Sequence, residues 1–416
     1  MQGDHQFATL SADEEEKLRR KISAKFDKMM RALYRQQGAQ MEISILAEEE
    51  VQQFINTHAD TLNGSFQKVE MSDAMRSRLE RSNWVFSGMK TFHELNEAFP
   101  SLIDEEGNRK PFERFLNDVR KVDETYNSNY LRSEYNFVHA SAAMAAKWEQ
   151  FQEDGDRYYL QYRTAGDDRV RPEHADLEGV TLPIDDPFWE EYYPPNGWNC
   201  RCTVVQVRKS KYPATPHDEA MRLGELATGK DTRQMFHFNP GKQQKAVPDY
   251  NPYTIRQCRT CPVAKGDGKT TLAAFIPQSN LCEACNILRA VNAADAKQVR
   301  MRAKKTIQGK ELRNAGFNHK VVVRGSSIKE WTNQPHNKYR AKNRALLDIK
   351  NLFYSAKYLG CTDNHKSRKD VVQSHVFECE IAGEASYILV FEYTWGEYVL
   401  HSVSDSPNIV RFIKKK

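Results

Sequence analysis

The sequence has no long apolar run, and none of its hydrophobic stretches approaches the roughly 20 residues that a membrane-spanning helix needs. The first residues, MQGDHQFATLSADEEEK, lack the basic and then apolar segments of a secretory signal peptide. We therefore expect a protein that stays in the cytoplasm of the cell that makes it. In that reducing compartment its eight cysteines are expected to be thiols or metal ligands rather than disulfides.

Acidic charge is scarce at the C-terminal end. Residues 297–416 carry 23 Lys and Arg against 11 Asp and Glu, whereas residues 1–296 carry 38 against 45. A basic module on an acidic body suggests that the C-terminal part meets nucleic acid, and a merely solvated basic surface is the alternative. The length of 416 residues indicates two to four domains.

Hydrophobic periodicity predicts a helix-rich N-terminal half. Ser11 and Glu14 have the spacing of a capping box before an amphipathic helix over 12–36. Further helices are expected at 44–59, 73–83 and 85–97, and one long helix or two end to end over 111–155. Beyond 314 we expect a helix over 337–357 and an antiparallel meander of four strands at 375–381, 386–393, 397–403 and 409–415.

The most specific motif lies between Tyr162 and Val205. It contains a Pro194-Pro195-Asn196-Gly197-Trp198 turn and ends in Cys200-Arg201-Cys202. The order of these residues closely resembles the signature of the phage Mu F-like minor head proteins, with the likeness extending over about 50–207. The resemblance implies a protein that sits with the portal in the capsid and assists head assembly and DNA packaging. The signature residues are Asp167, Asp168, Arg169, Arg171, His174, Cys200 and Cys202.

Two roles are open for the signature side chains. The acidic pair can form ion pairs with Arg169, Arg171 or Arg201 and so hold the Pro-rich loop in place. Alternatively, His174 and the two cysteines can join an acidic residue in a zinc site, although Cys-x-Cys is a weaker metal pattern than Cys-x-x-Cys. We favour the structural role.

A second motif consists of two Cys-x-x-Cys pairs separated by 20 residues. Four thiolates on two turns make a closed tetrahedral Zn²⁺ site, whose role is to fold a small ribbon. The pairs are Cys258 with Cys261 and Cys282 with Cys285.

The C-terminal module, about 315–416, resembles a phage-borne branch of the barnase–EndoU–colicin–RelE nucleases in its PHNKYRAKN, LFYSAKYLG and strand segments. Such a fold implies metal-independent RNA cleavage, which needs a base, an acid and cations for the phosphate. Among the module's histidines, His319, His336, His365, His375 and His401, we expect His375 and His336 to serve as acid and base. Lys338 would contact phosphate, His401 is a further catalytic candidate, Ser402 and Ser404 would be supporting donors, and Arg340, Lys342 and Arg344 would bind nucleic acid.

These observations predict a multidomain α+β protein. We expect a head-protein domain at 1–210, a linker at 211–257, a zinc ribbon with a basic helix at 258–310 and a nuclease-like module at 311–416. The expected partners are the portal and capsid components, packaged DNA or host RNA, and a cognate immunity protein. The expected location is the host cytoplasm during assembly and then the virion head. The alternative is a purely structural portal-associated protein whose inactive C-terminus only contacts nucleic acid.

Overall fold

The computed structural model divides the chain into two compact units, Met1–Val291 and Asn292–Lys416, and the chain passes from one to the other within helix α12 (Glu283–Thr306). Among the described residues, no helix combines the length and the apolarity needed to cross a bilayer. The structure describes residues 10–228, 235–248, 251–253, 283–333, 339–363, 368–381, 383–404, 408–411 and 413.

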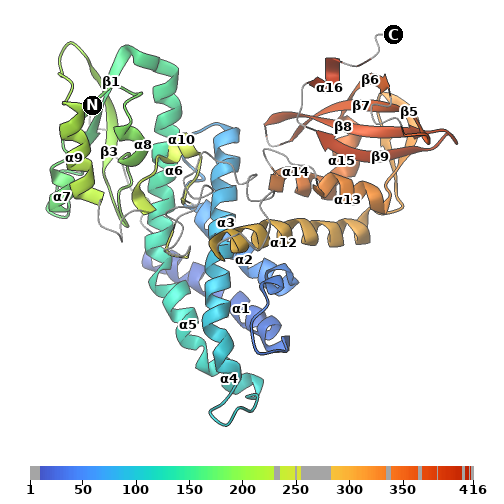
Figure 1. The fold of residues 1–416 in the computed structure, drawn as a ribbon, viewed down its shortest axis with the longest axis horizontal. Helices are drawn as coiled ribbons and strands as arrows, with labels where there is room; N and C mark the ends of the chain where they lie inside the picture. The colour runs from blue at the N-terminus through green and yellow to red at the C-terminus, as the bar shows by residue number, and fades with distance from the viewer. Residues whose placement is uncertain are drawn as a thin grey trace. The chain divides into compact units, whose positions relative to one another are not determined.

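Unit 1 is built on long helices, with a small antiparallel sheet of order β2-β1-β3 (Figure 1). Its longer helices are α1 (Ala12–Arg35), α2 (Glu49–Gly64), α3 (Asp73–Ala98) and α6 (Leu131–Asp154), and its strands are β1 (Tyr158–Arg163), β2 (Thr181–Leu182) and β3 (Thr203–Arg208). The shorter pieces are η1 (Ile43–Ala47), η2 (Phe99–Leu102), α4 (Phe112–Asp118), α5 (Arg120–Glu124), η3 (Thr125–Asn129), η4 (Gly155–Arg157), α7 (Pro172–Ala175), α8 (Phe188–Glu191), α9 (His217–Thr228) and α10 (Pro240–Gln243).

Helix α1 begins as its sequence predicts. The Ser11 hydroxyl accepts from the backbone N–H of Glu14, and the Glu14 carboxylate accepts from the backbone N–H of Ser11, so the capping box is complete. The apolar residues of the helix that recur at steps of three and four are buried, among them Ile22, Phe26 and Leu33. The apolar face of α1 is thus covered within the protein.

Two expectations for the helices are corrected. The segment 73–98 is one continuous helix rather than two. The segment 111–155 is neither one helix nor two, because it is divided into α4, α5, the π turn η3 and α6. The π turn has a physical reason, since the backbone carbonyl of Tyr126 accepts from the buried ammonium group of Lys90 and Asn127 donates to Glu94.

The described residues of the expected linker, 211–228, 235–248 and 251–253, belong to unit 1. Phe236 and Phe238 are buried and lie against the ring of Phe137 on α6. Tyr253 is also buried and donates to Glu134. Close packing extends to α3, where a Cβ added at Gly88 would lie 2.5 Å from Cγ1 of Val291, so only glycine permits this approach.

Unit 2 is an α+β module with a mixed sheet of order β4-β5-β9-β8-β7-β6. Strands β7, β8 and β9 form three strands of the expected antiparallel meander, and β6, which was not expected, pairs with β7. Strand β5 joins β9 in parallel. The strands are β4 (Glu311–Asn314), β5 (Phe317–Val322), β6 (Lys357–Asp363), β7 (Val371–Ile381), β8 (Glu384–Tyr393) and β9 (Tyr398–Ser404). The helical pieces are α13 (Gly325–Asn333), α14 (Tyr339–Ala345), η8 (Leu346–Asp348), α15 (Ile349–Ser355) and α16 (Asn408–Arg411).

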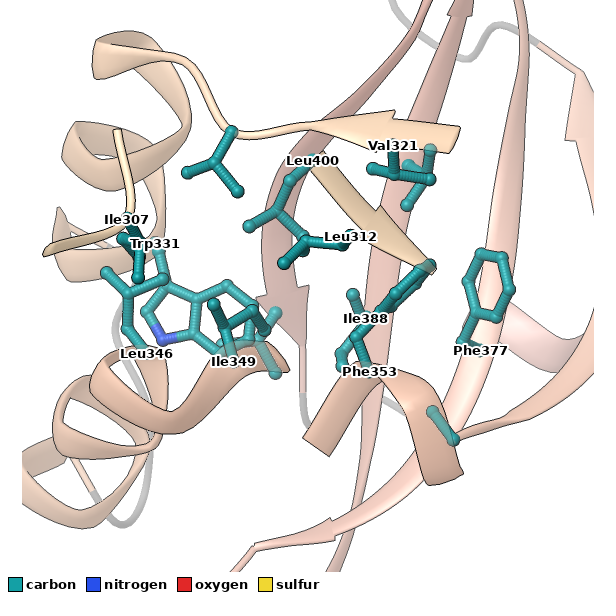
Figure 2. Packing of buried hydrophobic residues seen from close by; sticks show 14 of the residues in the cluster. Ile307, Leu312, Val321, Trp331, Leu346, Ile349, Phe353, Phe377, Ile388 and Leu400 are labelled. Carbon is teal, nitrogen blue, oxygen red and sulfur yellow. The ribbon is translucent and has the colours of Figure 1, made fainter. Parts of the chain in front are cut away.

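One face of this sheet is covered by helices and forms the core of the unit. Figure 2 shows Trp331, Leu346 and Phe353 from the helices facing Phe377 and Leu400 from the strands. The prediction of a strand at 409–415 is wrong within the described residues, because Asn408–Arg411 forms a short helix. The helix expected over 337–357 is interrupted by η8, and Lys357 already belongs to β6.

Candidate functional site

The signature segment of unit 1 is held by a bidentate ion pair. Both oxygens of the Asp167 carboxylate accept from the guanidinium group of Arg201, and Asp167 also accepts from the backbone N–H of Arg169. The hydrogen bonds from Arg201 hold the pKa of Asp167 well below its usual range. Asp168 and Arg169 are exposed. Of the acidic pair, Asp167 forms ion pairs with Arg201 and Arg169, whereas Asp168 is exposed.

The Pro-rich turn is docked onto helix α6. The Trp198 ring lies 5.0 Å from the Phe137 ring, and the backbone carbonyl of Trp198 accepts from Arg171 at 2.6 Å. A Cβ at Gly197 would lie 3.2 Å from Nη1 of Arg171, so the glycine leaves room for the guanidinium group. On the other side of the turn, the buried hydroxyl of Tyr162 donates to Asn196 at 2.8 Å. The turn is thereby fixed from two elements.

His174, Cys200 and Cys202 lie together in the interior. His174 is on the single-turn helix α7, and both cysteines directly precede β3. The Nδ1 atom of His174 lies 3.8 Å from each of the two Sγ atoms, and all three side chains are buried. Hydrogen bonding from Cys202, assisted by His174, lowers the pKa of Cys200, while hydrogen bonding to Cys200 and burial raise the pKa of Cys202. The cluster thus favours one thiolate beside one thiol and an imidazole.

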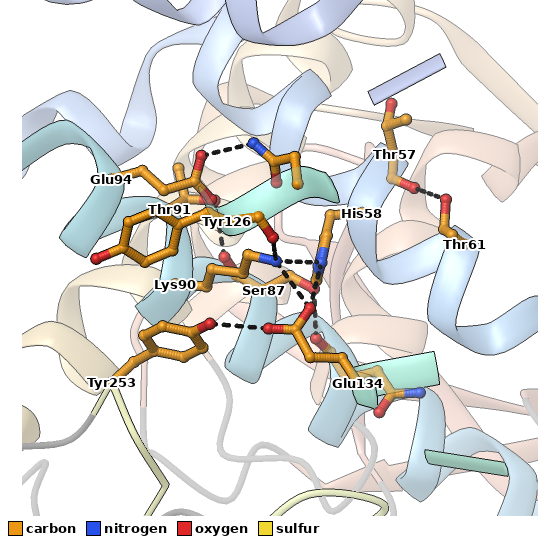
Figure 3. Close-up of polar contacts among 12 residues, drawn as sticks. Thr57, His58, Thr61, Ser87, Lys90, Thr91, Glu94, Tyr126, Glu134 and Tyr253 are labelled. Carbon is orange, nitrogen blue, oxygen red and sulfur yellow. Dashed lines mark hydrogen bonds and ion pairs between the residues drawn. The ribbon is translucent and has the colours of Figure 1, made fainter. Parts of the chain in front are cut away.

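A buried polar network that no sequence motif indicated joins several helices of unit 1 (Figure 3). The ammonium group of Lys90 on α3 uses all three of its protons. It donates to Glu134 at 2.7 Å, to the carbonyl of Tyr126 at 2.6 Å and to Nε2 of His58 at 3.0 Å. On the other side of Glu134, the hydroxyl of Tyr253 donates at 2.8 Å.

Burial controls the titration of this network. Desolvation, assisted by the charge of Lys90, lowers the pKa of His58 to about 4. Burial raises the pKa of Glu134, but Lys90 and His58 outweigh it and hold the value at about 2. Glu94 is desolvated with less compensation, and its pKa is raised to about 8. At neutral pH, Lys90 and Glu134 therefore form an ion pair beside a neutral imidazole and a protonated Glu94.

In unit 2 the structure places His375 between two polar partners. Its Nδ1 lies 2.9 Å from the Tyr358 hydroxyl, and its Nε2 lies 3.0 Å from Oε2 of Glu392. The Tyr398 ring is 5.5 Å from the imidazole, and His319 stacks on Tyr398. Burial lowers the pKa of His375. This arrangement holds a neutral imidazole in a fixed orientation on the sheet, where the residue is buried with an exposure of 5%.

The other expected catalytic and nucleic-acid-binding residues do not gather around His375. His401 stacks on Phe391, which alternates along β8 with Val390 and Glu392 and so faces the other side of the sheet. Lys342 is fully buried, so its side chain is not at the surface where nucleic acid would bind. Ser402 is buried and Ser404 half-buried, and Arg344 is exposed, 3.8 Å from Asp295. His336, Lys338, His365 and the side chain of Arg340 lie outside the described residues.

The expected zinc ribbon also lies largely outside the described residues. Cys258, Cys261 and Cys282 are not described, and of Cys285 only the backbone, in α12, is described. Within the described part of the chain, His174, Cys200 and Cys202 are the group whose ligand atoms gather, all within 4.8 Å of one another.

Comparisons with known proteins agree with the signature. Residues 106–205 match the family described as Phage Mu protein F like protein, and residues 292–400 match the Large polyvalent protein-associated domain 3. The second match names no nuclease activity. No solved structure matches the chain.

Two curated relatives are similar to the chain. It is 34% identical over 168 residues to the candidate capsid assembly protein F of Escherichia phage Mu, and the match covers 36% of each chain. It is 35% identical over 110 residues to the Mu-like prophage FluMu F protein of Haemophilus influenzae, covering 24% of this chain and 27% of the relative. The chain therefore spans about a third of the length of these relatives. The match to the Mu F-like family covers the docked turn, the Asp167–Arg201 pair and the His174 cluster.

Proposed function

We propose that this protein acts in the assembly of a phage head, as a minor component that associates with the portal. The observation that carries the proposal is the signature segment. The residues of this segment have an order that resembles that of the minor head proteins, and they fold together and pack on α6. They lie within residues 106–205, which match the family. The similarity to a relative from phage Mu that is named for capsid assembly adds support.

At the signature segment, the surface that unit 1 offers to a partner is charged. The long helices bury their apolar faces against one another. At the signature segment, Asp167 is fixed by Arg201, while its neighbours Asp168 and Arg169 are exposed. A charged loop on a rigid support gives specificity to a protein contact, because its backbone is already ordered before binding.

Co-expression of the full chain with the portal protein of the same phage tests this proposal. We expect the two proteins to co-purify through unit 1. Trp198→Ala removes the ring that packs on Phe137 and should weaken the association, because the turn is then no longer fixed. Trp395→Ala, at an exposed position of unit 2, is the matched control and should leave it unchanged. Failure of the wild-type chain to co-purify would count against the portal contact.

A second candidate function concerns unit 2, and His375 favours it. The imidazole has a fixed orientation between Glu392 and Tyr358, and one of these two contacts must give way to the substrate before a ring nitrogen can act as general acid or base. We propose that unit 2 cleaves RNA without a metal ion, with Lys338 contacting phosphate and His336 as the second proton-transfer group. A cognate immunity protein would then protect the producing cell. An inactive module that only contacts packaged DNA or host RNA is the alternative.

The four cysteines Cys258, Cys261, Cys282 and Cys285 keep their predicted role as ligands of a structural Zn²⁺. The spacing of the two pairs carries this proposal. In the same account, the protein is present in the host cytoplasm during assembly and in the head of the finished particle.

A further inference from the structure

The side chains of His174, Cys200 and Cys202 converge from two places in the chain. His174 is 26 residues from Cys200 and 28 from Cys202, and the intervening segment contains the Pro-rich turn. All three residues are buried, with exposures of 2%, 4% and 7%. We propose that these three residues bind a transition-metal ion, with zinc as the best fit, which clamps α7 to the start of β3.

The separations of the donor atoms suit a tetrahedral ion. A metal–sulfur distance of about 2.3 Å and a metal–nitrogen distance of about 2.1 Å place nitrogen and sulfur about 3.6 Å apart, and two sulfurs about 3.8 Å apart. Here Nδ1 of His174 lies 3.8 Å from both sulfurs, and the three donor atoms are within 4.8 Å of one another. Small side-chain rotations suffice to complete the coordination.

Hydrogen bonding alone explains the cluster less well. Without a metal ion, Cys202 and His174 both hydrogen-bond to Cys200. Because Nδ1 offers only one lone pair or one proton, it cannot also bond to Cys202. Both sulfurs nevertheless lie at the same distance from Nδ1. The other ring nitrogen, Nε2, is buried and has no hydrogen-bond partner among the described residues. The polar contacts of the buried ring are thus directed at the two cysteines, and a metal ion can be bound by all three groups at once.

The charge of the site is also suitable for an ion. Two thiolates and a neutral imidazole around a divalent cation give a net charge of zero, which lowers the cost of burial. Arg171 and Arg201 lie within electrostatic reach of the cysteines and further stabilise thiolates. Thiolate and imidazole ligands favour zinc over magnesium or calcium, which prefer oxygen ligands. The described residues add no fourth His, Cys, Asp or Glu to the group, so one coordination position is left for a small ligand such as water.

The site-specific test is cysteine alkylation of the full chain, read at each cysteine by peptide mass spectrometry. The protein is labelled with iodoacetamide after loading with zinc and after treatment with a chelator. We expect Cys200 and Cys202 to be protected with zinc and labelled after chelation. Cys361, a half-buried free thiol in unit 2, is the internal control and should be labelled equally in both states. Equal labelling of Cys200 and Cys202 in both states would overturn the proposal, because their reactivity would then be set by burial and not by zinc.

Metal content provides the second measurement. The Cys200→Ser/Cys202→Ser variant should contain one zinc ion fewer per chain than Cys361→Ser, whatever the four cysteines between 258 and 285 bind. His174→Ala should lose the same ion. An unchanged metal content in these variants, or a Cys200–Cys202 disulfide in protein purified under native conditions, would contradict the proposal. The alkylation result does not depend on any variant, so a variant that fails to fold leaves the test intact.

Discussion

The ammonium nitrogen of Lys90 lies 2.7 Å from Oε2 of Glu134, and both side chains are buried in unit 1. These two residues come from α3 and α6, and their shared contacts reach α2 through His58, the π turn through Tyr126 and the segment 251–253 through Tyr253. A charged pair in this position fixes how the helices meet, because each charge is stable only when the other is present. The pair therefore orders the helical body that supports the signature segment.

Removing one member of this pair should destabilise unit 1 strongly. Lys90→Met leaves the Glu134 carboxylate buried without its cation, and we expect a loss of about 3–5 kcal/mol in the free energy of unfolding. The double variant Lys90→Met/Glu134→Leu removes both charges and should recover much of that loss. Urea denaturation followed by the fluorescence of the tryptophans measures both. The single variant Glu134→Leu is measured as well. If the loss of unfolding free energy in the double variant equals the sum of the losses in the two single variants, the two residues act independently.

The buried carboxyl group of Glu94 should make stability decrease toward alkaline pH. Its pKa is about 8 in the folded protein, far above that of an exposed glutamate, so its contribution is fully present below about pH 4.5 and is lost as the pH rises through 8. His58, with a folded pKa of about 4, acts in the opposite direction, and its contribution is lost as the pH falls from about 6.5 through 4. The two effects offset each other between about pH 4.5 and 6.5, and Glu94 acts alone from 6.5 to 8.

Glu94→Gln should therefore remove a decline of up to about 2 kcal/mol between pH 6.5 and 8. Thermal unfolding across this range measures the decline in the wild-type chain and its absence in the variant. The exposed position Glu105 provides a control, since Glu105→Gln should keep the wild-type profile. Identical profiles for all three proteins would mean that Glu94 is not the group responsible.

The Asp167–Arg201 ion pair should order the signature segment. Asp167→Asn keeps the size of the side chain but removes the charge that Arg201 binds, so the segment around 164–170 should exchange its amide hydrogens faster. Asp168→Asn makes the same chemical change one residue later, at an exposed position, and should have little effect. Hydrogen exchange read by mass spectrometry compares the two. Similar exchange in both variants would argue that the bidentate contact does not hold this segment.

Unit 2 should cleave RNA in the presence of a chelator and leave 2′,3′-cyclic phosphate ends. If His375 transfers a proton in the reaction, His375→Ala in the full chain should lower the rate by roughly 10²–10⁴-fold. Lys338→Ala should instead make the activity more sensitive to salt, because a phosphate contact is lost. A folded wild-type chain that leaves every RNA intact would favour the inactive module.

The sequence predicted the elements that depend on local pattern. The capping box of Ser11 and Glu14 and the meander of β7, β8 and β9 follow from spacing and turn residues alone. The order of the signature residues also identified the part of the chain that the Mu F-like family matches. These features are visible because each one lies within a short stretch of the chain.

Features that depend on distant residues could not be predicted in this way. Lys90 and Glu134 stand 44 positions apart on helices that each satisfy their own periodicity, so neither signals the other. The Pro-rich segment that contains Phe236 has the composition of a linker, and only its packing on Phe137 makes it part of the core. Lys342 belongs to a basic run that is typical of a nucleic-acid surface, yet its helix turns it inward.

The most direct test of the proposed role in head assembly is quantitative mass spectrometry of purified heads from the phage that encodes this chain. Our account predicts that the protein is present in the heads and in assembly intermediates that contain the portal. It also predicts that Trp198→Ala reduces its amount in those particles while Trp395→Ala does not. Absence of the wild-type protein from both the heads and the intermediates, at normal expression in the infected cell, would contradict the central claim.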